Sequence, residues 1–138
     1  FEIINKSVFG VAIVNENIID RVNILQATRI AMEQAISSLT DKLIPTKNRR
    51  IHIIVDGNVT LNLSLPYTKI IKGDSKSKSI ACASILAKVI RDHIMRLYDK
   101  IYPQYGFIRH KGYPTKGHRA ILKRLGPSQI HRKSFHCV

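Results

Sequence analysis

The chain has 138 residues, of which 44% are hydrophobic, so it can form the core of one domain over residues 1–138 rather than a disordered tail. No apolar run approaches the roughly 20 residues of a membrane-spanning helix, so we expect no membrane contact and a cytoplasmic location. Residues 1–68 contain 7 Lys and Arg against 6 Asp and Glu, whereas residues 69–138 contain 16 against 3. Such a one-sided excess of basic residues is typical of proteins that bind nucleic acids, although a basic ribosomal-type protein would share it.

The first part of the chain is predicted to alternate strand and helix. β-Branched and aromatic residues within residues 1–14 favour a strand, and residues 15–20 form a connector or short helical turn. Apolar residues then recur at steps of three and four over residues 24–39, which predicts an amphipathic helix preceded by Asn23 as its cap. A polar loop follows over residues 45–50.

An acidic residue follows the next predicted strand. Residues 51–55 are a β-branched run interrupted by His52, and the run ends at Asp56 and Gly57. The carboxyl ends of strands in open α/β sheets are common positions for binding groups. Asp56 could equally begin a turn in which Gly57 supplies a positive φ, and the residues alone favour that simpler role.

A polar, basic segment connects a short strand to a long helix. Residues 67–71 can form the strand, and Asp74 is predicted to cap the helix that follows. Exposed amides and the dipole at a helix start favour anions, so a phosphate could bind there. Basic and hydroxyl side chains surround this position: Lys72, Lys76, Lys78, Ser75, Ser77 and Ser79.

The predicted helix over residues 78–98 carries one carboxylate on an otherwise apolar stripe. Asp92 follows Ile85 and Val89 at helical spacing, so it shares their face. A carboxylate in that position needs a metal, a hydrogen-bond network or a cation as its partner. The residues alone favour a salt bridge with Lys88 or Arg96.

Aromatic and basic residues interleave beyond this helix, as in surfaces that stack bases or sugars and contact phosphates. Packing in the loop is the expected role of Tyr102 and Phe107, whereas Tyr113 is the better candidate for an exposed platform. Residues 115–125 are predicted to form a capped helix that stops at Gly-Pro. The basic tail at residues 131–133 is either solvated or phosphate-binding.

Together these segments resemble the ribonuclease HII family, whose members cut the RNA strand of RNA-DNA hybrids and cut beside ribonucleotides embedded in duplex DNA. The resemblance runs from about Val8 to Phe135. It is carried by Ile24-Leu25-Gln26-Ala27-Thr28, Val55-Asp56-Gly57, Gly73-Asp74-Ser75-Lys76-Ser77, the helix from Ser79 to Asp92, His110-Lys111-Gly112-Tyr113, Leu125-Gly126-Pro127-Ser128 and His131-Arg132-Lys133-Ser134-Phe135.

The resemblance implies a ribonuclease H-like α/β fold, with a mixed sheet flanked by helices, and catalysis by Mg²⁺ or Mn²⁺ held by four carboxylates. It places two of these metal ligands and catalytic residues at Asp56 and Asp92, against the roles that the residues alone favour. Tyr113 matches a tyrosine that stacks on the sugar beside the cleavage junction. Further nucleic-acid contacts are expected at Lys76, Ser84, Lys88, His110 and Lys111.

One family motif is missing. The family begins with Asp-Glu-Ala-Gly-Arg-Gly on its first strand, and no Asp-Glu pair occurs in this sequence. We therefore expect the chain to be the C-terminal two thirds of such an enzyme, without its N-terminal strands, inactive alone and monomeric when complete. The alternative is a non-catalytic basic module that binds nucleic acid, and such a module would keep or strengthen duplex binding when Asp56 and Asp92 become Asn.

Overall fold

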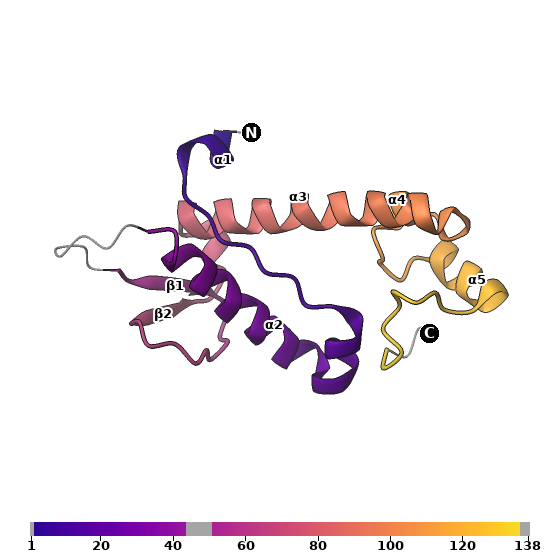
Figure 1. Cartoon of the computed structure of the whole chain (residues 1–138), viewed down its shortest axis with the longest axis horizontal. Helices are drawn as coiled ribbons and strands as arrows, with labels where there is room; N and C mark the ends of the chain where they lie inside the picture. Colours follow the sequence, from indigo (N-terminus) through magenta and orange to yellow (C-terminus); the bar gives the residue numbers. More distant parts are fainter. Residues whose placement is uncertain (1, 44–50, 136–138) are drawn as a thin grey trace. The chain divides into compact units, whose positions relative to one another are not determined.

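The computed structural model describes residues 2–43 and 51–135, so the predicted loop at residues 45–50 lies outside the described residues. The described part is an α/β protein (Figure 1). None of its helices is both long and apolar enough to cross a membrane. The elements in chain order are α1 (Glu2–Lys6), α2 (Glu16–Thr40), β1 (Ile53–Asp56), β2 (Tyr67–Ile70), η1 (Gly73–Ser75), α3 (Lys78–Ile101), η2 (Pro103–Tyr105), α4 (Phe107–His110) and α5 (Lys116–Leu125).

The chain divides into two compact units. The first unit consists of Phe1–Val14 and Leu25–Leu86, and the second consists of Asn15–Ile24 and Ala87–Val138. Both long helices, α2 and α3, therefore contribute to both units. A single domain over the whole chain stays a prediction.

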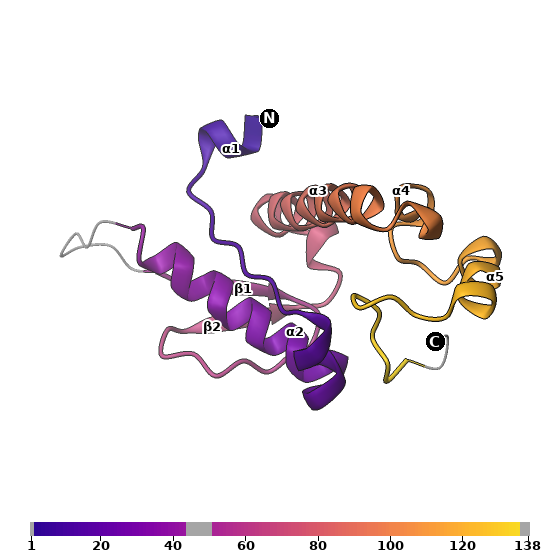
Figure 2. The same cartoon turned by 45° about the vertical axis from the view of Figure 1, so that its right-hand side comes forward.

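The two predicted strands are confirmed and form a parallel pair in the first unit. Ile53 lies opposite Tyr67, and Asp56 lies opposite Ile70. Val55, on β1, is buried, as expected for a β-branched strand residue that faces a core. The part of α2 from Leu25 onward runs beside the pair in both views (Figures 1 and 2), and Ala27 on this helix is buried.

The predicted helix after Asn23 is confirmed, but helical structure starts earlier. Asn23 has φ 70° and ψ 167°, which interrupts α2. The segment before it, expected to be a connector or short turn, is also helical from Glu16. Asn15 caps it, because its Oδ1 accepts a 3.0 Å hydrogen bond from the amide of Ile18.

The strand predicted within residues 1–14 is wrong. Residues 2–6 form α1, and residues 7–14 run without ladder partners among the described residues, alongside α2 (Figures 1 and 2). Gly10 explains the packing: a Cβ there would collide with the backbone oxygen of Ala35 and lie 2.7 Å from the amide nitrogen of Leu39. The extended backbone therefore packs on a helix instead of pairing with a strand.

The predicted long helix and the predicted final helix are also confirmed. The helix α3 extends to Ile101, about one turn beyond the expected end. In α5, the Thr115 hydroxyl oxygen accepts a 3.2 Å bond from the amide of His118, and the helix stops at Gly126, which has φ 72°. Local capping chemistry thus sets both ends of α5.

The core of the second unit is aromatic. Phe107 is 1% exposed, so the packing role expected for it is confirmed. Its ring stacks on Tyr105, with 5.6 Å between centroids and 9° between planes. Three histidines complete this core, and one of them is His131, which the sequence had assigned to a basic tail.

Candidate functional site

Asp56 lies at the carboxyl end of β1 with its side chain exposed. Its Oδ1 accepts a 2.7 Å hydrogen bond from the amide of Gly73, the first residue of η1. Gly57 has φ 79°, as the turn hypothesis required, but the carboxylate bonds 17 residues away rather than within its own turn. No hydrogen bond reaches its Oδ2 within the described residues, so this oxygen is open to a ligand.

Gly73 is required by this close approach. A Cβ on Gly73 would lie 2.5 Å from Cδ1 of Ile80 and 3.2 Å from Oδ1 of Asp56. The glycine therefore lets the backbone come near enough to hold the carboxylate from one side. The family motif from Gly73 to Ser77 has a structural role next to Asp56.

The helix cap predicted at Asp74 is wrong. Asp74 lies inside η1 and accepts a 2.9 Å bond from the amide of Ser75, whereas α3 begins only at Lys78. Ser75, Lys76 and Ser77 separate the aspartate from the start of α3. Lys76 and Ser84 are exposed in the same unit, where they are accessible to a ligand.

Asp92 lies on α3 in the second unit, and its partner is Arg91. Its Oδ1 accepts bonds from Arg91 Nη2 at 3.0 Å and Nε at 3.3 Å. The predicted salt bridge to Lys88 or Arg96 is wrong, since Arg96 Nε instead bonds the backbone oxygen of Asp92 at 3.3 Å. Sequence reasoning missed Arg91 because adjacent helical residues point in different directions, and only its long side chain makes the contact.

The charge of Asp92 is stabilised by its surroundings. The hydrogen bond from Arg91 lowers the pKa of its carboxyl below the ordinary value, and the positive charges of Arg91, Lys111 and Lys88 act in the same direction. Lys88 is exposed beside it. The carboxylate therefore stays ionised at neutral pH and can attract a cation.

Tyr113 is 55% exposed, as predicted for a platform. Its hydroxyl oxygen accepts a 2.6 Å bond from Arg91 Nη1, and the guanidinium carbon lies 5.0 Å from the ring centroid. The loop before it is held in an unusual shape, with positive φ at Lys111 and Gly112. Arg91 thus links the exposed ring to Asp92.

His110 and Lys111 are used within the protein. His110 is buried: its Nε2 donates to the carbonyl of Tyr105 at 2.9 Å, and its Nδ1 accepts from the amide of Gly112 at 3.2 Å. Lys111 Nζ donates to the carbonyl of Ile108 at 2.7 Å but remains partly accessible. His110 therefore offers no free ring nitrogen to a ligand in this geometry.

A hydrogen-bonded chain of buried side chains lies behind Tyr113. His118 Nδ1 is 3.0 Å from the Tyr113 carbonyl, and its Nε2 is 3.1 Å from Nε2 of His131. His131 Nδ1 accepts from the amide and hydroxyl of Ser128, at 3.0 and 2.7 Å. Burial lowers the pKa of both histidines. Residue spacing gave no sign of this chain, because its members meet only through tertiary packing.

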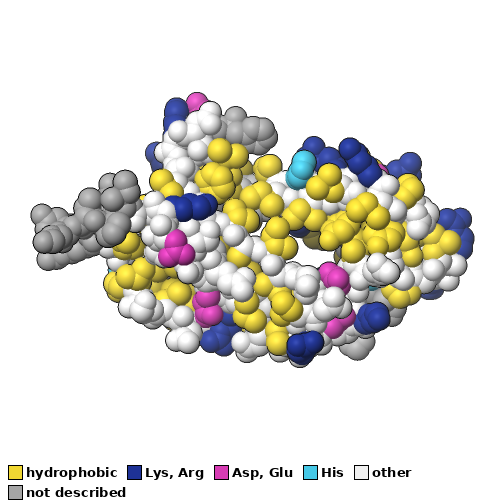
Figure 3. Space-filling model, viewed as in Figure 1, with side chains coloured by type: hydrophobic (Ala, Val, Ile, Leu, Met, Phe, Trp, Pro, Cys, Tyr) yellow, Lys and Arg dark blue, Asp and Glu magenta, His cyan; other side chains and the backbone are white. Residues whose placement is uncertain are grey.

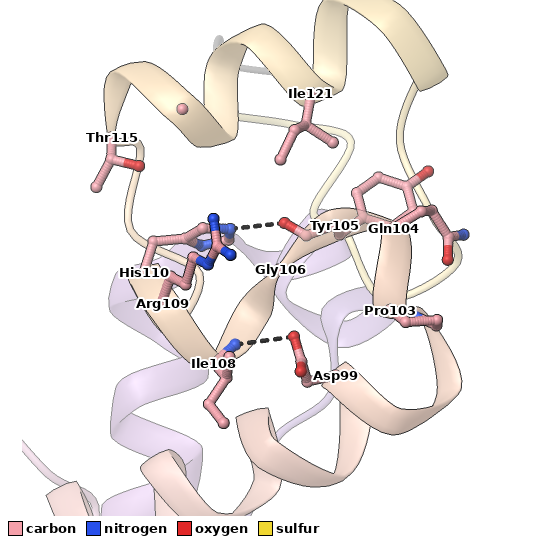
Figure 4. Close-up of a pocket in the computed structure, with 11 residues that line it drawn as sticks. Asp99, Pro103, Gln104, Tyr105, Gly106, Ile108, Arg109, His110, Thr115 and Ile121 are labelled. Atoms are coloured by element: carbon pink, nitrogen blue, oxygen red, sulfur yellow. Dashed lines mark hydrogen bonds between the residues drawn. The ribbon is translucent and has the colours of Figure 1, made fainter.

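A cavity of about 510 Å³ lies elsewhere in the second unit (Figure 4). Its walls come from the end of α3, η2, α4 and α5. Asp99 lies at its edge, where Oδ1 accepts a 3.0 Å bond from the amide of Ile108, as the dashed line shows. Of the predicted site residues, His110 lines this cavity, whereas Asp56, Asp92 and Tyr113 are not among the described residues that line it, so the cavity is not the metal site predicted from the sequence.

Basic side chains gather on the second unit. Figure 3 shows Lys and Arg over the later turns of α3 and near α5. This basic surface can hold the sugar-phosphate backbone of a nucleic acid. Its exposed members include Lys88, Arg96, Lys100, Arg109, Lys116, Arg119, Lys123 and Arg124.

No complete metal centre is present among residues 2–43 and 51–135, where no three His, Cys, Asp or Glu side chains gather closely enough to hold an ion. Asp56 belongs to the first unit and Asp92 to the second. Each is a carboxylate, the ligand type that Mg²⁺ and Mn²⁺ prefer, so the chemistry of the two donors fits such a cation.

Comparison with known proteins identifies close relatives. A family model described as Ribonuclease HII matches residues 1–138. The ribonuclease HII of Alkaliphilus metalliredigens is 44% identical over 141 residues, covering 98% of this chain and 66% of the relative. Those of Clostridioides difficile and Ligilactobacillus salivarius are 47% and 48% identical, covering 98% and 99% of this chain and 51% of each relative. The chain thus spans half to two thirds of their length.

Proposed function

Because the chain belongs to the ribonuclease HII family, we propose that it forms part of an endonuclease that cuts RNA in RNA-DNA hybrids and at ribonucleotides embedded in duplex DNA. The observation that carries the proposal is the linked arrangement of Tyr113, Arg91 and Asp92, which joins an exposed aromatic ring to a carboxylate on a basic surface. A ring can stack on a sugar while the carboxylate stays near the adjoining phosphate.

Asp56 and Asp92 are the residues of this chain that would hold the divalent metal, Mg²⁺ or Mn²⁺. Asp56 has one oxygen oriented by Gly73, and Asp92 has one oriented by Arg91, while the second oxygen of each carboxylate has no hydrogen bond from the described residues. A bound cation would supply positive charge to the scissile phosphate and would activate a water molecule. The low pKa of Asp92 supports this role, since a metal binds the ionised form.

Contacts to the nucleic acid come from side chains that are accessible in the structure. Lys76 follows η1, Ser84 and Lys88 lie on α3, and Lys111 and Tyr113 lie on the loop before α5. His110 is buried and does not itself contact the nucleic acid in this arrangement; it supports the interface by shaping this loop through Tyr105 and Gly112.

With only two carboxylate ligands, the 138-residue chain should bind metal weakly and should not cut nucleic acid by itself. A second candidate function is therefore a non-catalytic module that binds duplexes, which the basic surface favours. We further propose that the protein acts in the cytoplasm and as a monomer.

The test is a titration of the chain with a duplex that contains one embedded ribonucleotide, with and without Mn²⁺. We expect Mn²⁺ to increase the affinity for this duplex, and to increase it more than the affinity for a duplex made of DNA alone. The variants Asp56→Asn and Asp92→Asn should remove that increment, whereas Asp41→Asn, an exposed aspartate in the described chain, should keep it. If both variants bind as well as or better than the unmodified chain with Mn²⁺ present, the non-catalytic module is correct.

A further inference from the structure

We infer that His118 is a positioning residue for Tyr113, and that the buried chain Ser128, His131, His118 fixes the backbone beneath the exposed ring. The inference rests on the proposed function, because Tyr113 must act as a stacking platform for its position to matter. It assigns a role in nucleic-acid binding to His118, His131 and Ser128, which do not themselves touch the nucleic acid.

The hydrogen-bond partners determine which nitrogen of each ring carries a proton. The Tyr113 carbonyl can only accept, so His118 Nδ1 donates and the neutral ring has Nε2 free to accept. His131 Nε2 must then donate to His118 Nε2. This leaves His131 Nδ1 as an acceptor, in agreement with the two bonds that Ser128 donates to it. Every hydrogen bond in this series can therefore form while both imidazole rings are neutral.

The series of hydrogen bonds from Ser128 through His131 and His118 ends on the backbone of Tyr113, the residue that it orients. The Tyr113 carbonyl accepts from His118 and also from the amide of Thr115 at 2.8 Å, while the Tyr113 amide donates to the His110 carbonyl at 2.8 Å. The positive φ of Lys111, a residue with a Cβ, makes the preceding loop unfavourable unless its surroundings hold it. Both polar groups of the Tyr113 backbone are therefore fixed.

Burial holds the hydrogen-bonded side chains of His118 and His131 in place. His118 and His131 are 4% and 8% exposed, and both pack on Phe107 with centroid distances of 6.0 and 5.5 Å. His118 also stacks on His110 at 3.9 Å. A buried imidazole is unfavourable unless both nitrogens are bonded, so loss of one bond disturbs its neighbours. Arg91 holds the hydroxyl at the opposite end of Tyr113, and the ring is thus held at both ends.

Two substitutions at His118 separate positioning from general stability. In His118→Asn the side-chain amide nitrogen can replace Nδ1 and still donate to the Tyr113 carbonyl. In His118→Gln the amide can replace only Nε2, which faces His131. We expect His118→Gln to weaken binding of a ribonucleotide-containing duplex about threefold to tenfold, the effect of one hydrogen bond, and His118→Asn to stay near the unmodified chain.

The same pair is then measured in a Tyr113→Ala background, where we expect the difference between Asn and Gln to disappear. Equal losses for both substitutions, or a difference that persists without the Tyr113 side chain, would overturn the inference while leaving the proposed function standing. If Tyr113→Ala alone binds like the unmodified chain, the platform proposed for Tyr113 is wrong, and the inference fails with it.

A milder variant and a direct measurement cover the case in which His118→Gln does not fold. Ser128→Ala removes one of the two donors to His131 and should weaken the same binding by a smaller factor, again only when Tyr113 is present. Nitrogen-15 NMR of the unmodified chain should show His118 protonated at Nδ1 and His131 at Nε2. The opposite tautomer at His118 would overturn the inference by itself.

Discussion

Arg91 Nη1 donates a 2.6 Å hydrogen bond to the hydroxyl of Tyr113, and the guanidinium carbon lies 5.0 Å from the centroid of the same ring. The remaining nitrogens of the guanidinium bond Asp92. The planar fork of arginine suits this double contact, which a lysine could not reproduce. A single side chain thus sets the orientation of both groups to which we assign substrate and metal binding.

Replacing Arg91 with Gln should weaken binding of a ribonucleotide-containing duplex about tenfold, because a charge-assisted hydrogen bond to the ring is lost. Fluorescence anisotropy with a labelled duplex measures the change. Arg96→Gln is the matched control, since it removes an equal charge from the same helix without touching Tyr113. Equal effects of the two substitutions would mean that only charge matters.

Replacing Gly10 with Ala should destabilise the first unit by about 2 kcal/mol, since the new methyl group would press on the backbone of α2 at Ala35 and Leu39. Denaturant unfolding followed by circular dichroism gives the value. Gly117→Ala in α5 is the control, because its Cβ would have no neighbour within 4 Å and helices favour Ala over Gly. A harmless Gly10→Ala would show that residues 7–14 do not pack on α2 in solution.

Stability should decline as the pH falls below about 6.5, the ordinary pKa of histidine. Burial lowers the pKa of His118 and His131 in the folded state, so the unfolded chain takes up protons first and is favoured by acid. Above pH 6.5 both states hold these rings neutral, and the stabilisation is retained. Thermal unfolding between pH 8 and pH 5 tests this, and the doubly substituted His118→Asn, His131→Gln chain should show a smaller decline.

Asp20 should contribute a second, more acidic step. Hydrogen bonds from Ser134 and Lys133 lower the pKa of its carboxyl below 3.8, so its stabilisation is present above that value and is lost as the pH falls further. Asp20→Asn should lower the melting temperature at pH 7 by a few degrees, while Asp41→Asn should not. If the two variants melt alike, the contact to Ser134 is unimportant.

Much of the fold could be predicted because its signals are local. The strands at β1 and β2 follow from β-branched runs, and α3 and α5 follow from periodicity together with Thr115 and the Gly-Pro stop. The exposure of Tyr113 and the burial of Phe107 also follow from their neighbours. In each case, residues within a few positions determine the structure.

The wrong predictions have one physical cause: a local sequence pattern does not indicate which distant residues will be in contact in the fold. Residues 1–14 have strand composition, yet a strand needs a ladder partner, and the segment packs on a helix instead. The imidazole of His131 is buried because His118 and Ser128 meet it in space. The salt bridge of Asp92 depended on a rotamer of Arg91 that spacing cannot indicate.

The contact between Asp20 and residues 133–134 also constrains the order in which the protein can fold. Its backbone and hydroxyl donors lie more than a hundred positions after the carboxylate. During synthesis the larger segment of the first unit, Leu25–Leu86, emerges between the two halves of this contact, and closing so long a loop is slow. On the ribosome, the early segment of α2 must therefore wait for more than a hundred further residues before it gains this partner.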